Sequence, residues 1–68
     1  MIALQMDAED ILAWQQRGIN ARILGQTAAD NPALPHITKA GIRPDRDNWR
    51  QMAEAWLFGW SIEDAIRA

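Results

Sequence analysis

The side chains that could carry out chemistry are few in this chain, and they are scattered along it. His36 is the only histidine. A metal site needs several converging ligands, and no group of histidines, aspartates and glutamates has ligand spacing here. Ser61 and the threonines Thr27 and Thr38 lack a local base for nucleophilic work. No glycine-rich phosphate loop follows a strand. We therefore predict a non-enzymatic protein without metal or cofactor, in which His36 is an ordinary loop residue.

The basic residues are more informative. Of the six arginines, two lie on the first predicted helix described below, and three lie at or near the start of the second. These five are Arg17, Arg22, Arg43, Arg46 and Arg50. Guanidinium groups bind phosphates and carboxylates, so these residues are candidates for contact with phosphates or with an acidic protein surface. Asp45 and Asp47 interrupt the second group, and intramolecular pairs such as Asp47 with Arg50 are the alternative.

The composition is that of a small globular protein with a slight acidic excess. The 68 residues are 49% hydrophobic and 24% charged, with a net charge of −2 and no cysteine. Nucleic-acid-binding proteins usually carry a basic footprint, so this charge argues mildly against a nucleic acid as the main partner. No apolar run reaches the roughly 18 residues that a membrane span needs. The first residues lack the pattern of a signal peptide, and we expect a cytoplasmic protein.

Tryptophans organise the second half of the chain. Three of the four lie within residues 49–60. Trp49, Ala53, Trp56 and Trp60 follow a 4-3-4 spacing, which places them on one stripe of a helix. This pattern predicts a helix over about residues 45–66 that continues past Ser61.

The first half predicts a helix over about residues 7–25. Asp7 is a suitable N-cap, and Gly25 is a suitable C-terminal stop. Between them, the positions that follow Trp14 at helical spacing are small: Gly18, Ala21 and Gly25. A glycine inside a helix costs about 1 kcal/mol relative to alanine. That cost is understandable if a large group must approach the backbone at Gly18.

The two stripes together predict the fold. We expect an all-α protein, an antiparallel two-helix hairpin in which the indoles of the second helix lie over the glycines of the first. Residues 26–44 form a long Pro/Gly loop pinned onto the helices, with one short helical turn possible at Asn31 and Pro32. The chain 1–68 is one domain. The predicted core residues are Trp14, Gly18, Gly25, Trp49, Trp56 and Trp60.

Both helices also carry apolar residues away from these stripes. Leu12, Ile19 and Ile23 lie on the first. The second carries Met52, Ala55, Phe58, Ile62 and Ile66. A two-helix hairpin covers one face of each helix, not two. The excess predicts a homodimer, which we favour, or a groove that takes a partner. Candidate partner-binding residues are therefore Ile19, Ile23, Phe58 and Ile62, together with the five arginines.

Several of these features together resemble the ribosome modulation factor family of very short proteins. They are Gly18 and Gly25, the Asp-Asn-Pro turn at 30–32, and residues 55–60 (Ala-Trp-Leu-Phe-Gly-Trp). The resemblance covers roughly residues 16–66, and Trp56-Leu57-x-Gly59-Trp60 is its most specific part. It implies a small two-helix protein that binds the small (30S) ribosomal subunit and promotes inactive ribosome dimers. Only packing residues match, so no binding residue is carried over.

Two functions are compatible with these patterns. By resemblance, the chain is a ribosome-associated regulator of translation. The alternative is a protein-binding inhibitor or anti-activator, of the kind found on phages and other mobile elements, that blocks a host regulatory protein through an exposed apolar helix face. The acidic charge favours the second function, and the tryptophan-glycine motif favours the first.

Overall fold

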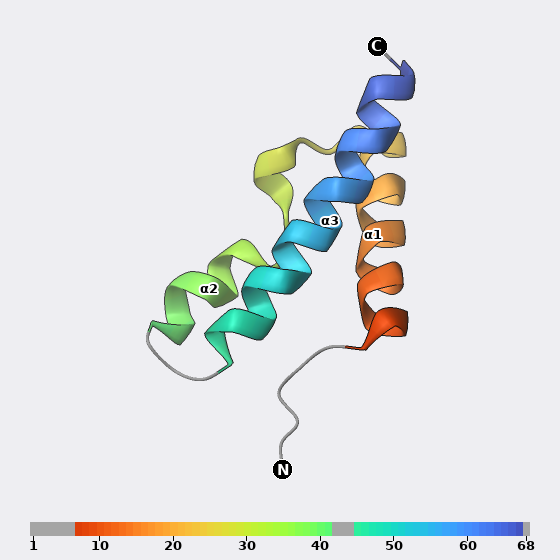
Figure 1. The fold of residues 1–68 in the computed structure, drawn as a ribbon. Coiled ribbons are helices and arrows are strands. Elements are labelled where there is room, and N and C mark those ends of the chain that lie inside the picture. Colours follow the sequence, from red (N-terminus) through yellow and green to blue (C-terminus); the bar gives the residue numbers. More distant parts are fainter. Residues whose placement is uncertain (1–6, 42–44, 68) are drawn as a thin grey trace.

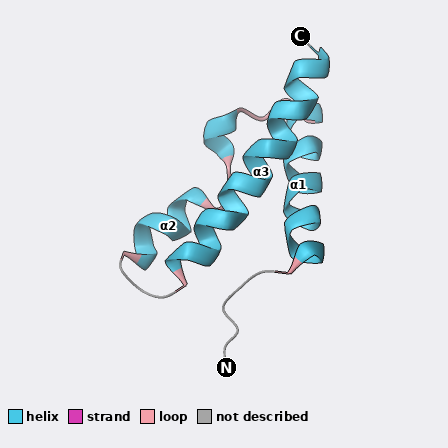
Figure 2. Ribbon diagram, viewed as in Figure 1, coloured by secondary structure: helices cyan, strands magenta, loops and turns pink. Residues whose placement is uncertain are grey.

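The computed structural model describes residues 7–41 and 45–67, and every regular element within these ranges is helical (Figure 1; Figure 2). The elements are α1 (Ala8–Ile23), the 3-10 turn η1 (Ala28–Asp30), α2 (Leu34–Ala40) and α3 (Arg46–Arg67). The predicted all-α class is confirmed. The two long helices lie within two residues of their predicted bounds, and α3 continues past Ser61 without a break.

The ends of α1 follow the predicted capping chemistry. The Asp7 carboxylate accepts a hydrogen bond of 2.9 Å from the backbone N–H of Asp10. At the other end Gly25 has a φ of +88°, a conformation that favours glycine. The N–H of Gln26 then donates to the carbonyl of Ala21 at 2.9 Å, the long-range bond of a Schellman motif. Gly25 therefore ends the helix, as predicted.

Residues 26–41 of the connection between α1 and α3 are folded, which corrects the long loop predicted over residues 26–44 for this part; residues 42–44 lie outside the described residues. The buried Asn31 anchors it, since its Nδ2 donates to the carbonyl of Ala53 at 2.9 Å and its Oδ1 accepts from the N–H of Ala33 at 3.1 Å. Pro35 lies in the first turn of α2, where its missing N–H is tolerated. More than one helical turn thus forms between the long helices.

The direction of α3 differs from the prediction. Trp14, near the start of α1, contacts Trp49 near the start of α3, while Arg22 and Asp64 pair near the two C-terminal ends. The two helices therefore run parallel, not antiparallel, as Figure 1 shows. The physical reason is the connection: η1 and α2 carry the chain back alongside α3 to the end at which α1 began.

The predicted glycine groove exists in a different form. A Cβ built on Gly18 would overlap the carbonyl oxygen of Trp56 and lie 2.9 Å from the backbone nitrogen of Trp60. A Cβ built on Gly59 would overlap the carbonyl oxygen of Gln15. Gly18 and Gly59 thus allow the backbone of the other long helix to approach closely, and the atoms nearest to each such Cβ belong to backbone, not to indole rings. Gly25 has no atom within 4 Å of such a Cβ, so its predicted role under an indole is wrong.

The tryptophans instead bind the connection and the helix ends. Trp56 is 2% exposed and is the one large side chain in the buried core, whose other apolar members in the described residues are alanines. The Nε1–H of Trp60 donates to the carbonyl of Gln26 at 2.9 Å. Trp49 meets Trp14 edge to face, with ring centroids 6.5 Å apart, and stacks on His36 at 3.9 Å. Each predicted core tryptophan therefore has a packing role.

Candidate protein-binding surface

One face of the α1–α3 pair is apolar and uncovered. We call it the open face. Ile11 of α1 and Ala55 and Phe58 of α3 line a hollow on it. Helical spacing places five further residues on the same side: Leu12, Ile19 and Ile23 of α1, and Ile62 and Ile66 of α3. The connection packs on the opposite side of the pair, where Pro32 and Trp56 line one hollow together with Ala21 of α1. Nothing in the described residues covers the open face in the same way.

The exposure of the open face is unusual for its residue types. Phe58 is 56% exposed, Ile62 is 42% exposed and Leu12 is 62% exposed. Phe58, Ile62 and Ile66 recur every four residues and so form one ridge along α3. Single exposed apolar residues are ordinary on protein surfaces, but a continuous group on one face indicates an interaction site.

A hollow of about 320 Å³ lies between the two helices on this face. Its lining residues are Ile11, Gln15, Gln51, Glu54, Ala55 and Phe58. Ala55 is buried, whereas Phe58 and Glu54 are exposed. The hollow therefore combines apolar walls with two amides and one carboxylate.

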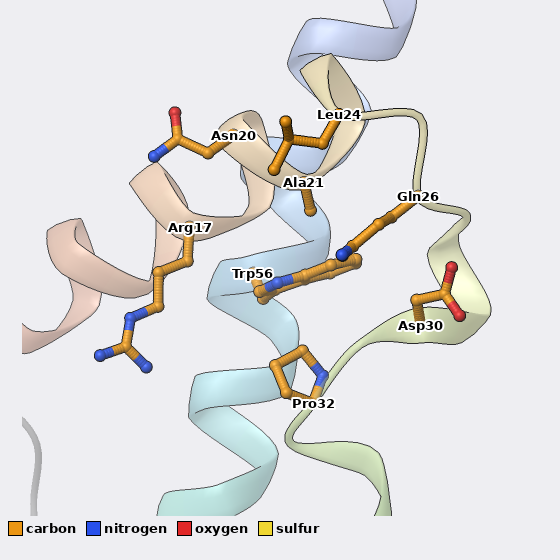
Figure 3. A pocket seen from close by; sticks show the side chains of 8 residues that line it. All are labelled: Arg17, Asn20, Ala21, Leu24, Gln26, Asp30, Pro32 and Trp56. Atoms are coloured by element: carbon orange, nitrogen blue, oxygen red, sulfur yellow. The ribbon is translucent and has the colours of Figure 1, made fainter.

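A second hollow, of about 380 Å³, lies on the opposite side, between α1 and the connection (Figure 3). Its lining residues are Arg17, Asn20, Ala21, Leu24, Gln26, Asp30, Pro32 and Trp56. The Asp30 carboxylate already accepts a hydrogen bond of 2.8 Å from the N–H of Thr27. Trp56 is almost fully buried there. Although this hollow is slightly larger, it lies where the connection packs against α1 and Trp56 of α3. We therefore favour the open face as the candidate functional site.

Most of the predicted arginines have partners within the chain. Arg22 Nε donates to Asp64 at 2.8 Å, and Arg50 lies 3.6 Å from Asp47. The guanidinium of Arg17 lies over the ring of Trp14, 4.6 Å from its centroid. Arg46 is exposed in the first turn of α3. Arg43 lies outside the described residues. Of the other four candidates, Arg17 and Arg22 lie on α1, whereas Arg46 and Arg50 lie near the start of α3.

The apolar candidates are placed together. Ile19 is half-buried, and Ile23, Phe58 and Ile62 are exposed on the open face. No signal in the sequence singles out Glu54, and its place in the hollow follows from the packing of α1 on α3. His36 was interpreted as a loop residue, yet it lies on α2 and stacks on a tryptophan. No spacing signal connects His36 with Trp49.

Comparisons of the chain with protein-family models, with curated proteins and with solved structures found no match. Among the described residues, no three histidine, aspartate or glutamate side chains are grouped so that they could hold a metal ion. Within the same residues, none of the helices combines the length and the apolar character needed to cross a membrane.

Proposed function

We propose that this protein is a small non-catalytic regulator of the cytoplasm that acts by binding another protein through the open face. The observation that carries the proposal is the exposed ridge of Phe58, Ile62 and Ile66 along α3, which begins where Phe58 and Ile11 of α1 line a common hollow. Burying one large apolar side chain contributes about 1.5–3 kcal/mol. An interface that covered this ridge would therefore gain enough free energy to support specific binding.

The charges also favour a protein partner. The net charge is −2, and two of the arginines considered for phosphate contact are paired with carboxylates. Phosphate binding by Arg22 would require breaking its bond to Asp64. A helix face that inhibits a regulatory protein by occupying its interface is consistent with this surface.

Ribosome association is the second candidate, and one observation favours it. Three of the residues that carry the resemblance to the ribosome modulation factor family have packing roles: Trp56 is buried, Gly59 allows the backbone of α1 to approach, and the indole of Trp60 donates to the carbonyl of Gln26. In this candidate, the partner is the 30S subunit and Arg46 is among the groups free to approach its phosphates.

A capture experiment tests the proposal. Tagged protein is incubated with host lysate, with and without nuclease and at rising salt, and wild type is compared with Phe58→Asp. The matched control is Leu57→Asp, since Leu57 is 43% exposed but points about 100° away around the helix. We expect a stoichiometric protein that survives nuclease and salt, is lost with Phe58→Asp and is retained with Leu57→Asp.

The opposite outcome supports the second candidate. Ribosomal association driven by phosphate contacts weakens steeply as salt rises. Recovery of 30S subunits that depends on low salt and does not respond to Phe58→Asp would contradict binding through the open face.

A further inference from the structure

We infer that the hollow of the open face receives an amphipathic helix that carries lysine or arginine beside its apolar stripe. This inference rests on the proposed function and names the chemistry of the partner. It is argued from the shape of the face, from the charge in the hollow and from the placement of the chain's own cations.

The shape fits a helix. The hollow follows the seam of two parallel helices that cross closely at Gly18 and Gly59. Ridges of side chains at four-residue spacing, such as Phe58 and Ile62, pack into the grooves of another helix. A third helix laid along this seam would place one large apolar side chain above the buried Ala55, between Ile11 and Phe58. This is the helix-in-groove mode of recognition.

The charge selects a basic helix. Glu54 is the one charged residue that lines the hollow, and it forms no ion pair with any residue that the structure describes. Its carboxylate is exposed and solvated in the free protein. A lysine or arginine beside the apolar stripe of a partner could reach this carboxylate, with Gln15 and Gln51 as neutral neighbours. An acidic helix would be repelled at the same place.

A second copy of this chain fits less well. Within residues 7–41 and 45–67, Arg22, Arg50 and Arg67 are paired with carboxylates of their own chain. Arg17 lies over Trp14 on the side that faces the connection, and it lines the opposite hollow. The other described cations, Lys39 of α2 and Arg46 in the first turn of α3, do not line the hollow of the open face. Among the described residues, a copy that presented its own open face would therefore bring no unpaired cation from that hollow to Glu54. The homodimer predicted from the sequence stays a prediction, and the experiment below decides it.

The test uses two synthetic 18-residue helical peptides with leucines at three- and four-residue spacing. One carries lysines beside the leucine stripe, and the other carries glutamates at the same positions. Light scattering first gives the mass of the free protein, and calorimetry then measures binding of each peptide. We expect a monomer that binds the lysine peptide at least roughly tenfold tighter than the glutamate peptide.

Variants locate the binding. Phe58→Ala is expected to weaken binding of the lysine peptide by roughly tenfold or more, because the aromatic ring that lines the hollow is removed. Glu54→Gln is expected to reduce the preference for lysine over glutamate. The controls are Leu57→Ala and Glu9→Gln, an exposed apolar residue and an exposed acid outside the hollow. Both are expected to bind like wild type, and circular dichroism verifies that each variant is folded.

Several results would overturn the inference. Equal binding of the two peptides, binding that ignores Phe58→Ala, or a preference that Glu9→Gln reduces as much as Glu54→Gln does would each contradict it. A dimeric mass that Phe58→Ala converts to a monomer would make a second copy the occupant. If neither peptide binds while capture from lysate still depends on Phe58, the basic helix is wrong and the proposed function stands. If neither peptide binds and capture from lysate does not depend on Phe58, both the basic helix and the proposed function are wrong.

Discussion

At the residue scale, two glycines set the distance between the long helices. Gly18 lies against the carbonyl of Trp56, and Gly59 lies against the carbonyl of Gln15. Both contacts are with backbone, which cannot rotate away as a side chain can. The glycines therefore determine how closely α1 and α3 pack, and hence the depth of the hollow beside them.

Gly18→Ala tests this role with a clear sign. Helix propensity alone would make the substitution stabilising by about 1 kcal/mol. Because the new methyl group would overlap the Trp56 carbonyl, we expect a net loss of about 2–3 kcal/mol. Urea denaturation followed by tryptophan fluorescence measures it, and Ser61→Ala, at an exposed position of α3, is the control. A variant as stable as wild type would show that the helices are not in backbone contact.

At the element scale, the connection decides the topology. A short loop after α1 would force α3 to return antiparallel. Here η1 and α2 intervene, and the bond from Asn31 to the Ala53 carbonyl holds the connection at the middle of α3. The stack of His36 on Trp49, with ring centroids 3.9 Å apart, then holds α2 near the start of α3.

His36→Ala should loosen α2 without separating the long helices. Loss of the stacked ring removes about 0.5–1.5 kcal/mol of contact energy, and Gly18 and Gly59 are untouched. The hydrogen-exchange rates of individual backbone amides are expected to rise in α2 and to stay unchanged in the middle of α1. Lys39→Ala, at an exposed position of the same helix, is the control. A uniform rise in exchange over all three helices would contradict a local role.

At the scale of the whole molecule, the core is small for the surface that remains exposed. The buried apolar residues in the described part of the chain are Ala21, Ala33, Ala40, Ala53, Ala55 and Trp56. Alanine buries little area, so the indole of Trp56 supplies much of the apolar burial. Meanwhile larger residues, Phe58 and Ile62 among them, stay in contact with water. Burial of these exposed side chains therefore does not stabilise the isolated chain, but it could stabilise an interface with a partner.

The isolated chain should accordingly be only marginally stable. A core of this size rarely supplies more than about 3–5 kcal/mol, and we expect a free energy of unfolding at or below that range in urea titrations. A ligand that binds only the folded state adds about 2.7 kcal/mol at 100 times its Kd. Addition of the lysine peptide should raise the urea midpoint, and the glutamate peptide should not. A free energy of unfolding near 10 kcal/mol without ligand would contradict this account.

The sequence by itself determined the two long helices, because their signals are local, whereas α2 was not predicted. Apolar spacing, the Asp7 cap and the positive φ at Gly25 each act within one or two turns, so α1 and α3 were predicted nearly to the residue. The predicted exposure of Phe58 and Ile62 also followed from spacing, since they lie off the tryptophan stripe.

Only the tertiary structure decided how these helices are arranged. The parallel direction of α3 follows from the folded connection, and it is seen in long-range contacts such as that of Arg22 with Asp64, which no spacing within a helix predicts. Spacing within a helix also does not predict that Gly18 packs against the backbone of Trp56, or that Glu54 lines the same hollow as Ile11. Helix formation depends on neighbours in the sequence, whereas helix packing depends on which surfaces the folded connection brings together.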